Sequence, residues 1–447
     1  MGSEASARSA GPAPTVRASR PLSKLPPGPG MAARDVAAHQ LGRIHSATVE
    51  IVAQQGYKAL KVRDVVRYAE VSTRAFYELF GSKEDCFLQT YDLISRRASQ
   101  RIIAAQASEP DWRKRPELAL EEFVQGVGRK PRDARLALVE AYAAGIASLE
   151  RAWRTERVFG AMLAEALART PSGVVVPPLV IEGIVSGVIH VARDRLLTDK
   201  MTQLESESVE LVGWSLGLAD PLVIELMRLD HQLRRPDAAL EPPVTLPAAD
   251  ELSSSKIADR ALILKVTAEM AAEKGYAQLT APRVRATARV SRSKFEAYFD
   301  GIEDCYLNAV DQYAGEAFAR AAHAQSTAQS EAGGVYRAIV ALCEHVAADP
   351  FLARVCLDND FPASVDGANS RRNLVAALTD LLMNGLPAMS PTMCEASMGA
   401  LWSLFHHHII RNRAMHSQVS ATLGYIVLAP TIGASAALAA IRAEQEQ

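Results

Sequence analysis

One short stretch of this 447-residue chain occurs twice, and this repetition limits the possible architecture more than any other feature. Residues 71–86 read VSTRAFYELFGSKEDC, and residues 290–305 read VSRSKFEAYFDGIEDC. The similarity extends without a gap over residues 43–92 and 262–311, where 18 of the 50 aligned pairs are identical. Chance would supply only a few identities, so we infer an internal duplication whose period is a whole domain. The length of the chain itself allows about two to four domains.

The apolar pattern of each copy predicts helices. Residues 44–52 carry apolar side chains at the i, i+3, i+4, i+7, i+8 spacing of one buried helix face, and residues 263–271 repeat that spacing. Gly56 and Gly275 follow at positions suited to left-handed helix ends. The pattern in both copies is helix, short helix, tight turn, short helix, long helix. No stretch resembles a series of alternating strands, so we predict an all-α chain.

Composition divides the chain further. Residues 1–32 are rich in Pro, Ser, Gly and Ala without apolar periodicity, which is typical of disorder, and residues 234–255 have the composition of a linker. We therefore predict six segments: a disordered tail (1–32), a first helix-turn-helix domain (33–82), a first helical domain (83–235), a linker (236–255), a second, diverged helix-turn-helix domain (256–301) and a second helical domain (302–447).

A helix-turn-helix presents the first turn of its second helix to the major groove of DNA. In the first copy this turn carries Thr73 and Arg74, and an arginine can donate a planar fork to guanine. The hydroxyl of Tyr77 can donate to a phosphate oxygen. Lys83 adds a charge at a helix start, where anions already bind well. Because the net charge of the chain is −2, DNA contact has to come from such local groups.

The string V-S-x-x-x-F-Y-x-x-F-x-S-K-E-D, after an apolar helix ending in Gly-Tyr, resembles the DNA-binding domain of TetR-type transcriptional regulators. The resemblance covers about residues 38–92 and, more weakly, residues 257–311. It implies phosphate contacts for the tyrosine and the lysine of this motif, and base reading by the start of the third helix. It also implies that each reader precedes a larger helical domain, which binds a small molecule and dimerises through its last helices.

The second copy departs from this motif, since Glu296 replaces Tyr77 and Ile302 replaces Lys83. Residues 275–294 nevertheless hold five basic and no acidic side chains, a local charge of 5 − 0 = +5, against 5 − 2 = +3 for residues 56–75. We predict that the second reader contacts DNA with a different sequence preference, and a retained scaffold with solvated arginines is the alternative. The residues expected at DNA are Lys61, Thr73, Arg74, Tyr77 and Lys83 in the first reader, and Thr280, Arg292, Ser293 and Lys294 in the second.

Each half ends in a pair of apolar helices. In the first half these are PLVIEGIVSGVIHVARDRLL (178–197) and a helix near 209–217. In the second half they are EASMGALWSLFHHHIIRNRAM (395–415) and a helix containing LGYIVLAP (423–430). Two pairs in one chain would form a four-helix bundle, the interface of an ordinary homodimer closed within a single chain. Such a pseudo-dimer, with unlike readers, should bind an asymmetric operator. Pairing of two whole chains is the alternative.

Several sharper interpretations are less favoured. The five cysteines lack a metal-ligand spacing and suit a reducing cytoplasm, and Cys86 and Cys305 should pack as small apolar groups. His406, His407 and His408 point about 100° apart on a helix, so packing is favoured over a metal site.

The uncharged run 414–441 is long enough to span a bilayer. Its polar residues and the Pro430–Thr431 break predict two shorter buried helices instead, so we expect no membrane contact.

The sequence therefore predicts an all-α chain of tandem TetR-like units that acts as a ligand-responsive repressor in the bacterial cytoplasm, nucleoid-associated when bound to DNA. Its partners would be double-stranded DNA and an unidentified small effector. No catalytic signature appears, so we expect neither an enzyme nor a cofactor. In one rival interpretation, only the first reader binds DNA and the second unit is a sensor and dimerisation module. The other rival is a ligand-binding or enzymatic helical protein that does not bind DNA.

Overall fold

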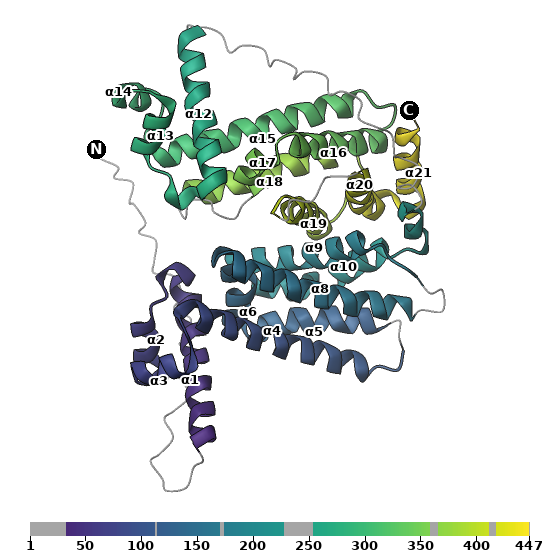
Figure 1. Cartoon of the computed structure of the whole chain (residues 1–447). Coiled ribbons are helices and arrows are strands. Elements are labelled where there is room, and N and C mark those ends of the chain that lie inside the picture. Colours follow the sequence, from purple (N-terminus) through teal and green to yellow (C-terminus); the bar gives the residue numbers. More distant parts are fainter. Residues whose placement is uncertain are drawn as a thin grey trace, which may run out of the picture. The chain divides into compact units, whose positions relative to one another are not determined.

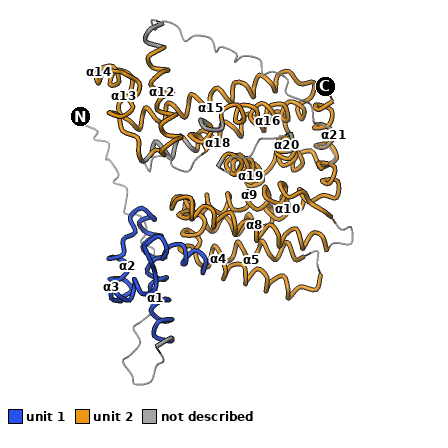
Figure 2. The backbone as a smooth tube through the Cα atoms, in the orientation of Figure 1, with its two compact units in different colours: residues 1–94 blue, residues 95–447 orange. Residues whose placement is uncertain are grey.

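The computed structural model describes residues 33–111, 114–169, 174–227, 254–357, 365–410 and 417–446. These ranges contain helices and turns and no strand, which confirms the predicted all-α class (Figure 1). The predicted tail 1–32 lies outside the described residues, as does the predicted linker except for its last two residues. The contacts between Cα atoms divide the chain into two compact units, Met1–Ile94 and Ser95–Gln447 (Figure 2).

The first unit contains the first reader, which we define as helices α1 to α3. Its elements are α1 (Ala33–Gln55), the 3-10 turn η1 (Tyr57–Ala59), α2 (Val62–Ala69), α3 (Thr73–Leu79) and the start of α4 (Lys83–Ala107). Gly56 ends α1 with φ +77, which glycine adopts without steric cost. The angle ψ of 163 lies outside the left-handed helical region, so the expected left-handed cap does not form there.

The second unit begins within α4, at Ser95, and first contains the helices that follow the first reader. Its elements are α5 (Arg115–Arg129), α6 (Pro131–Arg135), the π-helical segment η3 (Leu136–Glu140), α7 (Ala141–Ala143), α8 (Ile146–Ala168), α9 (Pro178–Leu197), α10 (Met201–Leu218) and the 3-10 turn η4 (Pro221–Ile224). The helix expected near 209–217 thus begins earlier, at Met201. The apolar helix expected at 178–197 is α9, and it is buried over most of its circumference.

The second half also belongs to the second unit. Its elements are α12 (Ser254–Lys274), η5 (Tyr276–Gln278), α13 (Ala281–Ala288), α14 (Arg292–Glu296), α15 (Ile302–Ser326), α16 (Glu331–Ala348), α17 (Pro350–Leu357), α18 (Val365–Met383), α19 (Pro391–Ile410), α20 (Ser417–Ile432) and α21 (Ala434–Gln445). We define α12 to α14 as the second reader. The helices that follow the two readers, α4 and α15, both have 25 residues.

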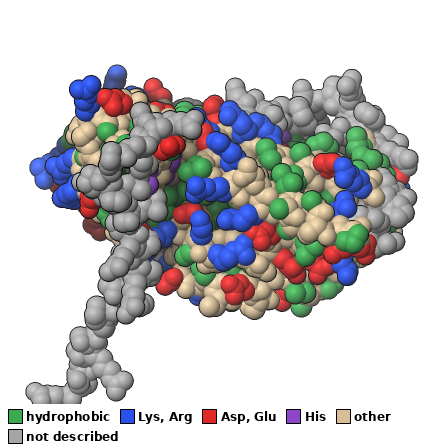
Figure 3. Space-filling model, turned by 90° about the horizontal axis from the view of Figure 1, so that it is seen from below, with side chains coloured by type: hydrophobic (Ala, Val, Ile, Leu, Met, Phe, Trp, Pro, Cys, Tyr) green, Lys and Arg blue, Asp and Glu red, His purple; other side chains and the backbone are tan. Residues whose placement is uncertain are grey.

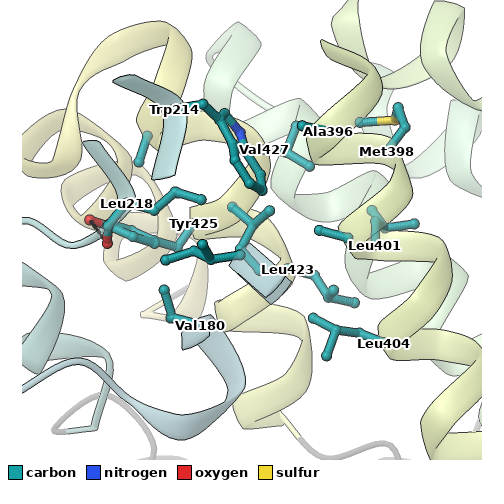
Figure 4. Packing of buried hydrophobic residues seen from close by; sticks show 14 of the residues in the cluster. Val180, Trp214, Leu218, Ala396, Met398, Leu401, Leu404, Leu423, Tyr425 and Val427 are labelled. Atoms are coloured by element: carbon teal, nitrogen blue, oxygen red, sulfur yellow. Dashed lines mark hydrogen bonds between the residues drawn. The ribbon is translucent and has the colours of Figure 1, made fainter. Parts of the chain in front are cut away.

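The core of the second unit lies where α9 and α10 pack against α19 and α20, so the two helix pairs do meet (Figure 4). Trp214 and Tyr425 are buried there, and each joins the two halves: Trp214 Nε1 donates to Ser397 Oγ at 2.9 Å, and Tyr425 Oη donates to the Leu218 carbonyl at 3.3 Å. The backbones of α9 and α19 approach closely, because a Cβ on Gly187 would lie 2.6 Å from the carbonyl oxygen of Ala396.

The expected break at Pro430 is wrong. Pro430 lies inside α20, and the chain turns at Gly433, whose φ is +83. A proline cannot donate to the carbonyl four residues earlier, which here belongs to Ile426. The hydroxyl of Ser397 donates to that carbonyl at 3.3 Å, so α19 supplies the hydrogen bond that α20 lacks. Within the described ranges, no helix is long and apolar enough to cross a membrane.

Candidate DNA-binding interface

In the first reader, α3 is held by its own sequence and by the core. The side chain of Ser72 caps the helix, since its Oγ accepts the N–H of Ala75 at 3.0 Å. Phe76 and Phe80 are buried and fix the inner face of the helix. The outer face carries Thr73, Arg74 and Tyr77, all exposed, and Tyr77 is 56% accessible. The three residues predicted to reach DNA from α3 therefore share one free surface.

The turn before α3 depends on a residue that the sequence pattern did not single out. Glu70 has φ 49 and ψ 45, the left-handed helical conformation, and its N–H donates to the carbonyls of Arg67 and Val66. Arg43 of α1 donates to the Glu70 carbonyl at 3.2 Å and so ties the turn to the first helix. The left-handed conformation is usually marked in a sequence by glycine or asparagine, and glutamate rarely adopts it. The sequence therefore gives no sign of this turn at position 70.

Arg74 forms an ion pair within α3 but is largely accessible to solvent. Its Nε lies 2.9 Å from Glu78 Oε1, and 89% of its side chain is accessible. An exposed ion pair of this kind contributes about 0.3–0.5 kcal/mol, so a guanine or phosphate can displace Glu78 at little cost. Lys61 is also exposed and precedes α2 as its N-cap residue.

Lys83 is engaged within the protein more than the motif implies. Its Nζ donates to the Leu60 carbonyl at 3.2 Å and lies 5.2 Å from the centroid of the Tyr57 ring. An ammonium group has three donors, so these contacts fix the side chain and still leave capacity for a phosphate oxygen. Lys83 thus remains a predicted phosphate contact, held in place at the start of α4.

The second reader repeats the backbone devices of the first. Arg289 takes the place of Glu70 with φ 56 and ψ 41, and Ser291 Oγ accepts the N–H of Lys294 at 3.2 Å. Phe295 and Phe299 are buried like their counterparts. The recognition helix is shorter, since α14 spans five residues and α3 spans seven.

The surface of the second reader differs. Arg292, Ser293 and Thr280 are exposed, but Arg292 Nε lies 2.7 Å from Glu296 Oε1, so the acid that replaces Tyr77 is neutralised locally. Lys294 forms an ion pair with Asp259 of α12, which directs it toward its own first helix. Of the predicted contacts in this copy, Lys294 therefore has the strongest competing partner.

Both readers contain the same buried polar contact beneath these surfaces. Thr48 Oγ1 lies 3.2 Å from Cys86 Sγ, and Thr267 Oγ1 lies 3.2 Å from Cys305 Sγ. Burial raises the pKa of each thiol to about 11, so both stay protonated near neutral pH. This agrees with the packing role that we expected for the two cysteines.

The histidine run lies in α19, and all three side chains are buried. His407 Nδ1 is 2.6 Å from Glu182 Oε1, and His408 Nδ1 is 2.9 Å from the Leu404 carbonyl. Among the residues that the structure describes, no group of three or more His, Cys, Asp or Glu side chains could hold a metal ion.

Comparison with known protein families gives a match in the first reader. Residues 44–90 match the family model of bacterial regulatory proteins, tetR family. The chain carries a tetR-family domain. This match supports a DNA-binding transcriptional regulator as the class of function. The matched range covers the second half of α1, all of α2 and α3, and the start of α4, and α3 is the helix that carries Thr73, Arg74 and Tyr77.

Two solved structures are similar to parts of this chain. One is the fatty acid degradation regulator FadR from Bacillus halodurans, at 17% identity over 39% of this chain and 96% of that chain, with a TM-score of 0.37. The other is a TetR-like transcriptional regulator from Rhodococcus sp. RHA1, at 18% identity over 42% of this chain and 98% of that chain, with a TM-score of 0.34. No curated protein matches the chain.

Proposed function

We propose that this chain is a ligand-responsive transcriptional repressor that acts as a single-chain pseudo-dimer on an asymmetric operator. The observation that carries the proposal is the exposed face of α3, where Thr73, Arg74 and Tyr77 stand side by side on a capped helix. Arg74 would read a guanine, Thr73 a base or a phosphate, and Tyr77 a phosphate. Lys61 and Lys83 would add phosphate contacts on either side.

The second reader is proposed to bind DNA through charge more than through the tyrosine and lysine that it lacks. Arg283 and Arg289 are exposed, Arg285 is partly exposed, and no acid occurs in residues 275–294. On the face shown in Figure 3, basic and acidic side chains are interspersed, and the net charge of the whole chain is −2. DNA would therefore be attracted by the local charge of each reader and not by a general field.

The packing of α9 and α10 on α19 and α20 supports the pseudo-dimer. Homodimers of bundle type bury such apolar helices between two chains, whereas here the partner helices belong to the same chain. A buried contact between the two helix pairs supports the same interpretation: Arg195 of α9 donates to Glu395 of α19 at 2.8 Å, across 200 residues of sequence. With its partner surface already occupied, one chain can present two readers.

An apolar cavity of about 100 Å³ supports the ligand response. Its wall comes from α4, α5, α8, α9 and α10 and includes Phe123, Phe159 and Val188, with Gln106 and Ser215 as its polar members. A small apolar or amphipathic molecule suits this lining. Because α4 is one helix that starts at Lys83 and reaches the cavity at Ile102 and Gln106, a ligand that spreads the wall would move the helix that follows the reader.

The test is a selection of duplexes by the full chain, followed by light scattering of the protein alone and with the selected duplex. We expect one chain on one asymmetric site. Two chains on a palindrome would show instead that the second reader has become structural and that whole chains pair. Absence of salt-dependent duplex binding would contradict DNA recognition altogether.

The ligand response is tested separately, with the selected operator in hand. Small apolar and amphipathic compounds are screened for weakening of operator binding, and Val188→Phe, which would fill the cavity, should abolish the response. Operator binding that no compound weakens would leave a constitutive regulator.

A further inference from the structure

The apolar cavity between α4, α5, α8, α9 and α10 has a wall without charge. Among the described residues that line it, none is Asp, Glu, Lys, Arg or His, and only Gln106 and Ser215 are polar. The other lining residues are aliphatic and aromatic side chains, a methionine and a proline. A charged ligand would therefore meet no counter-charge in this wall.

An ion pair links α4 and α5 beside the wall. Arg101 precedes the lining residue Ile102, and Glu122 precedes the lining residue Phe123. Arg101 Nε lies 3.4 Å from Glu122 Oε1, and Arg129 also pairs with Glu122. Moving an ion out of water is costly unless an opposite charge compensates it. Because these neighbouring charges already pair with one another, a carboxylate or an ammonium group inside the cavity would bear that cost in full.

The two polar side chains indicate which neutral group the wall can accept. Ser215 Oγ donates to the Leu211 carbonyl at 2.7 Å, so its hydrogen is used within α10 and its oxygen remains an acceptor. Gln106 lies in the last turn of α4, and its carboxamide can both donate and accept. These two side chains suit a ligand group that donates one hydrogen bond and can accept another. A neutral hydroxyl is a group of this kind.

The apolar part of the wall indicates the body of the ligand. Phe123 and Phe159 pack edge to face with 6.3 Å between ring centroids, and the thioether of Met162 is suited to contact an aromatic ring. An apolar cavity of about 150 Å³ binds benzene. Because this cavity measures about 100 Å³, a ring would enter only by pushing the wall outward. That displacement is the one proposed above to move α4.

From this lining we propose that the ligand of the cavity is an uncharged molecule with a ring-sized apolar body and one hydroxyl group, an alcohol or a phenol. This ligand class rests on the proposed function, in which the cavity is the effector site. The hydroxyl would donate to Ser215 and bond Gln106, and the body would lie against Phe123, Phe159 and Val188. Organic anions and cations would be rejected by the cost of desolvation and not by their size.

The test compares benzyl alcohol, benzoate and benzylammonium, which share one ring and differ in charge. Their binding to the full chain is measured by isothermal titration calorimetry at neutral pH, without DNA. We expect benzyl alcohol to bind at least about tenfold more tightly than either ion. Equal affinities would leave the charged group outside the wall, tighter binding of an ion would reveal a counter-charge, and no binding of benzyl alcohol would show that a ring cannot enter. Each of these three results overturns the proposal.

Three variants locate the site. Val188→Phe fills the cavity and should abolish binding of benzyl alcohol. Ser215→Ala combined with Gln106→Leu should weaken benzyl alcohol about fivefold and leave toluene, which has no hydroxyl, unchanged. The matched control is Ser206→Ala, because Ser206 is an exposed serine of α10 whose hydroxyl also donates to a carbonyl of its own helix. It should change nothing.

Equal weakening of both probes in the double variant, or weakening of neither, would remove the hydroxyl contact and overturn the proposal. This comparison decides the matter if Val188→Phe does not fold.

Failure of this ligand class can be told apart from failure of the ligand response. An ion that bound in the cavity and weakened operator binding would keep the response and overturn the uncharged class. Benzyl alcohol that bound as expected and left operator affinity unchanged would support the uncharged class and contradict the response.

Discussion

The two readers share three features. In each, the residue before the turn has a left-handed backbone conformation, at Glu70 and Arg289, and a serine caps the third helix. Each also buries a contact between a threonine hydroxyl and a cysteine thiol. They differ in how they are anchored. The first reader lies in a compact unit of its own, whereas the second clusters with the helical body of the second unit. There α12 packs on α15 and α17, and Tyr306 Oη donates to the Val355 carbonyl at 3.1 Å.

The two readers thus share their backbone conformation and caps, and they differ in their surfaces and in their packing against other helices. Burial and capping constrain a residue wherever the fold recurs, whereas a DNA contact is constrained only while it is used. Tyr77 and Lys83 were replaced in the second copy, but Phe76 and Ser72 were not. We therefore expect equivalent substitutions in the two readers to differ in their effects on stability and on DNA binding.

Truncating the core phenylalanine should give the largest effect. Phe76→Ala and Phe295→Ala each leave a cavity in a fully buried site and should cost about 3–5 kcal/mol. Hydrogen exchange should localise the damage differently. In Phe76→Ala we expect faster exchange confined to residues before 95, while Phe295→Ala should also expose α15 and α17. Identical, confined patterns in both variants would show that the second reader is no better anchored than the first.

Arg74→Ala should have the next largest effect, on DNA alone. Loss of a bidentate base contact costs about 1–3 kcal/mol and relaxes specificity at one position. The matched variant is Ser293→Ala, since Ser293 occupies the equivalent position in the second reader. We expect it to change affinity far less, because a hydroxyl offers one weak contact. Binding to the selected operator and to single-base variants measures both, and an equal loss would argue that the readers recognise DNA in the same way.

Restoring the motif in the second reader should have a moderate effect. Glu296→Tyr removes an acid and adds a phosphate donor, and Ile302→Lys adds a cation at the start of α15. Together they should tighten duplex binding about tenfold and steepen its salt dependence by about one unit of slope. The reverse change, Tyr77→Glu in the first reader, should weaken binding by a similar factor. If the restored variant bound DNA as the parent does, the second reader would lie away from the duplex.

Particular residues show how much the sequence could predict. The helix order, the caps at Ser72 and Ser291 and the buried cysteines follow from local pattern, because capping and burial leave a signature in residue type and spacing. Arg195 is different, since its partner Glu395 lies 200 residues away and no local pattern links the two. The apolar cavity beside Phe159 was also missed, because its empty space results from packing between helices that sequence periodicity does not relate.

The smallest expected effect concerns the left-handed turn residues. Glu70→Gly and Arg289→Gly remove a side chain from a conformation that costs other residues roughly 1–2 kcal/mol, but glycine also loses more backbone entropy on folding. A net stabilisation of about 0.5–1 kcal/mol should result for Arg289→Gly. The gain should be smaller for Glu70→Gly, because that variant also loses the ion pair between the Glu70 carboxylate and the buried Arg43, 3.4 Å apart. Thermal or urea unfolding measures both. For Glu70→Gly, DNA binding should stay the same or tighten, since an acid is lost near the recognition helix.

For Arg289→Gly, stability should rise, because Arg289 has the left-handed conformation of the turn. The slope of DNA affinity against salt concentration should fall by about one unit, because Arg289 also carries one of the charges proposed to meet phosphate. A variant that gains stability and keeps the full slope would remove Arg289 from the interface and leave it a role in the turn alone.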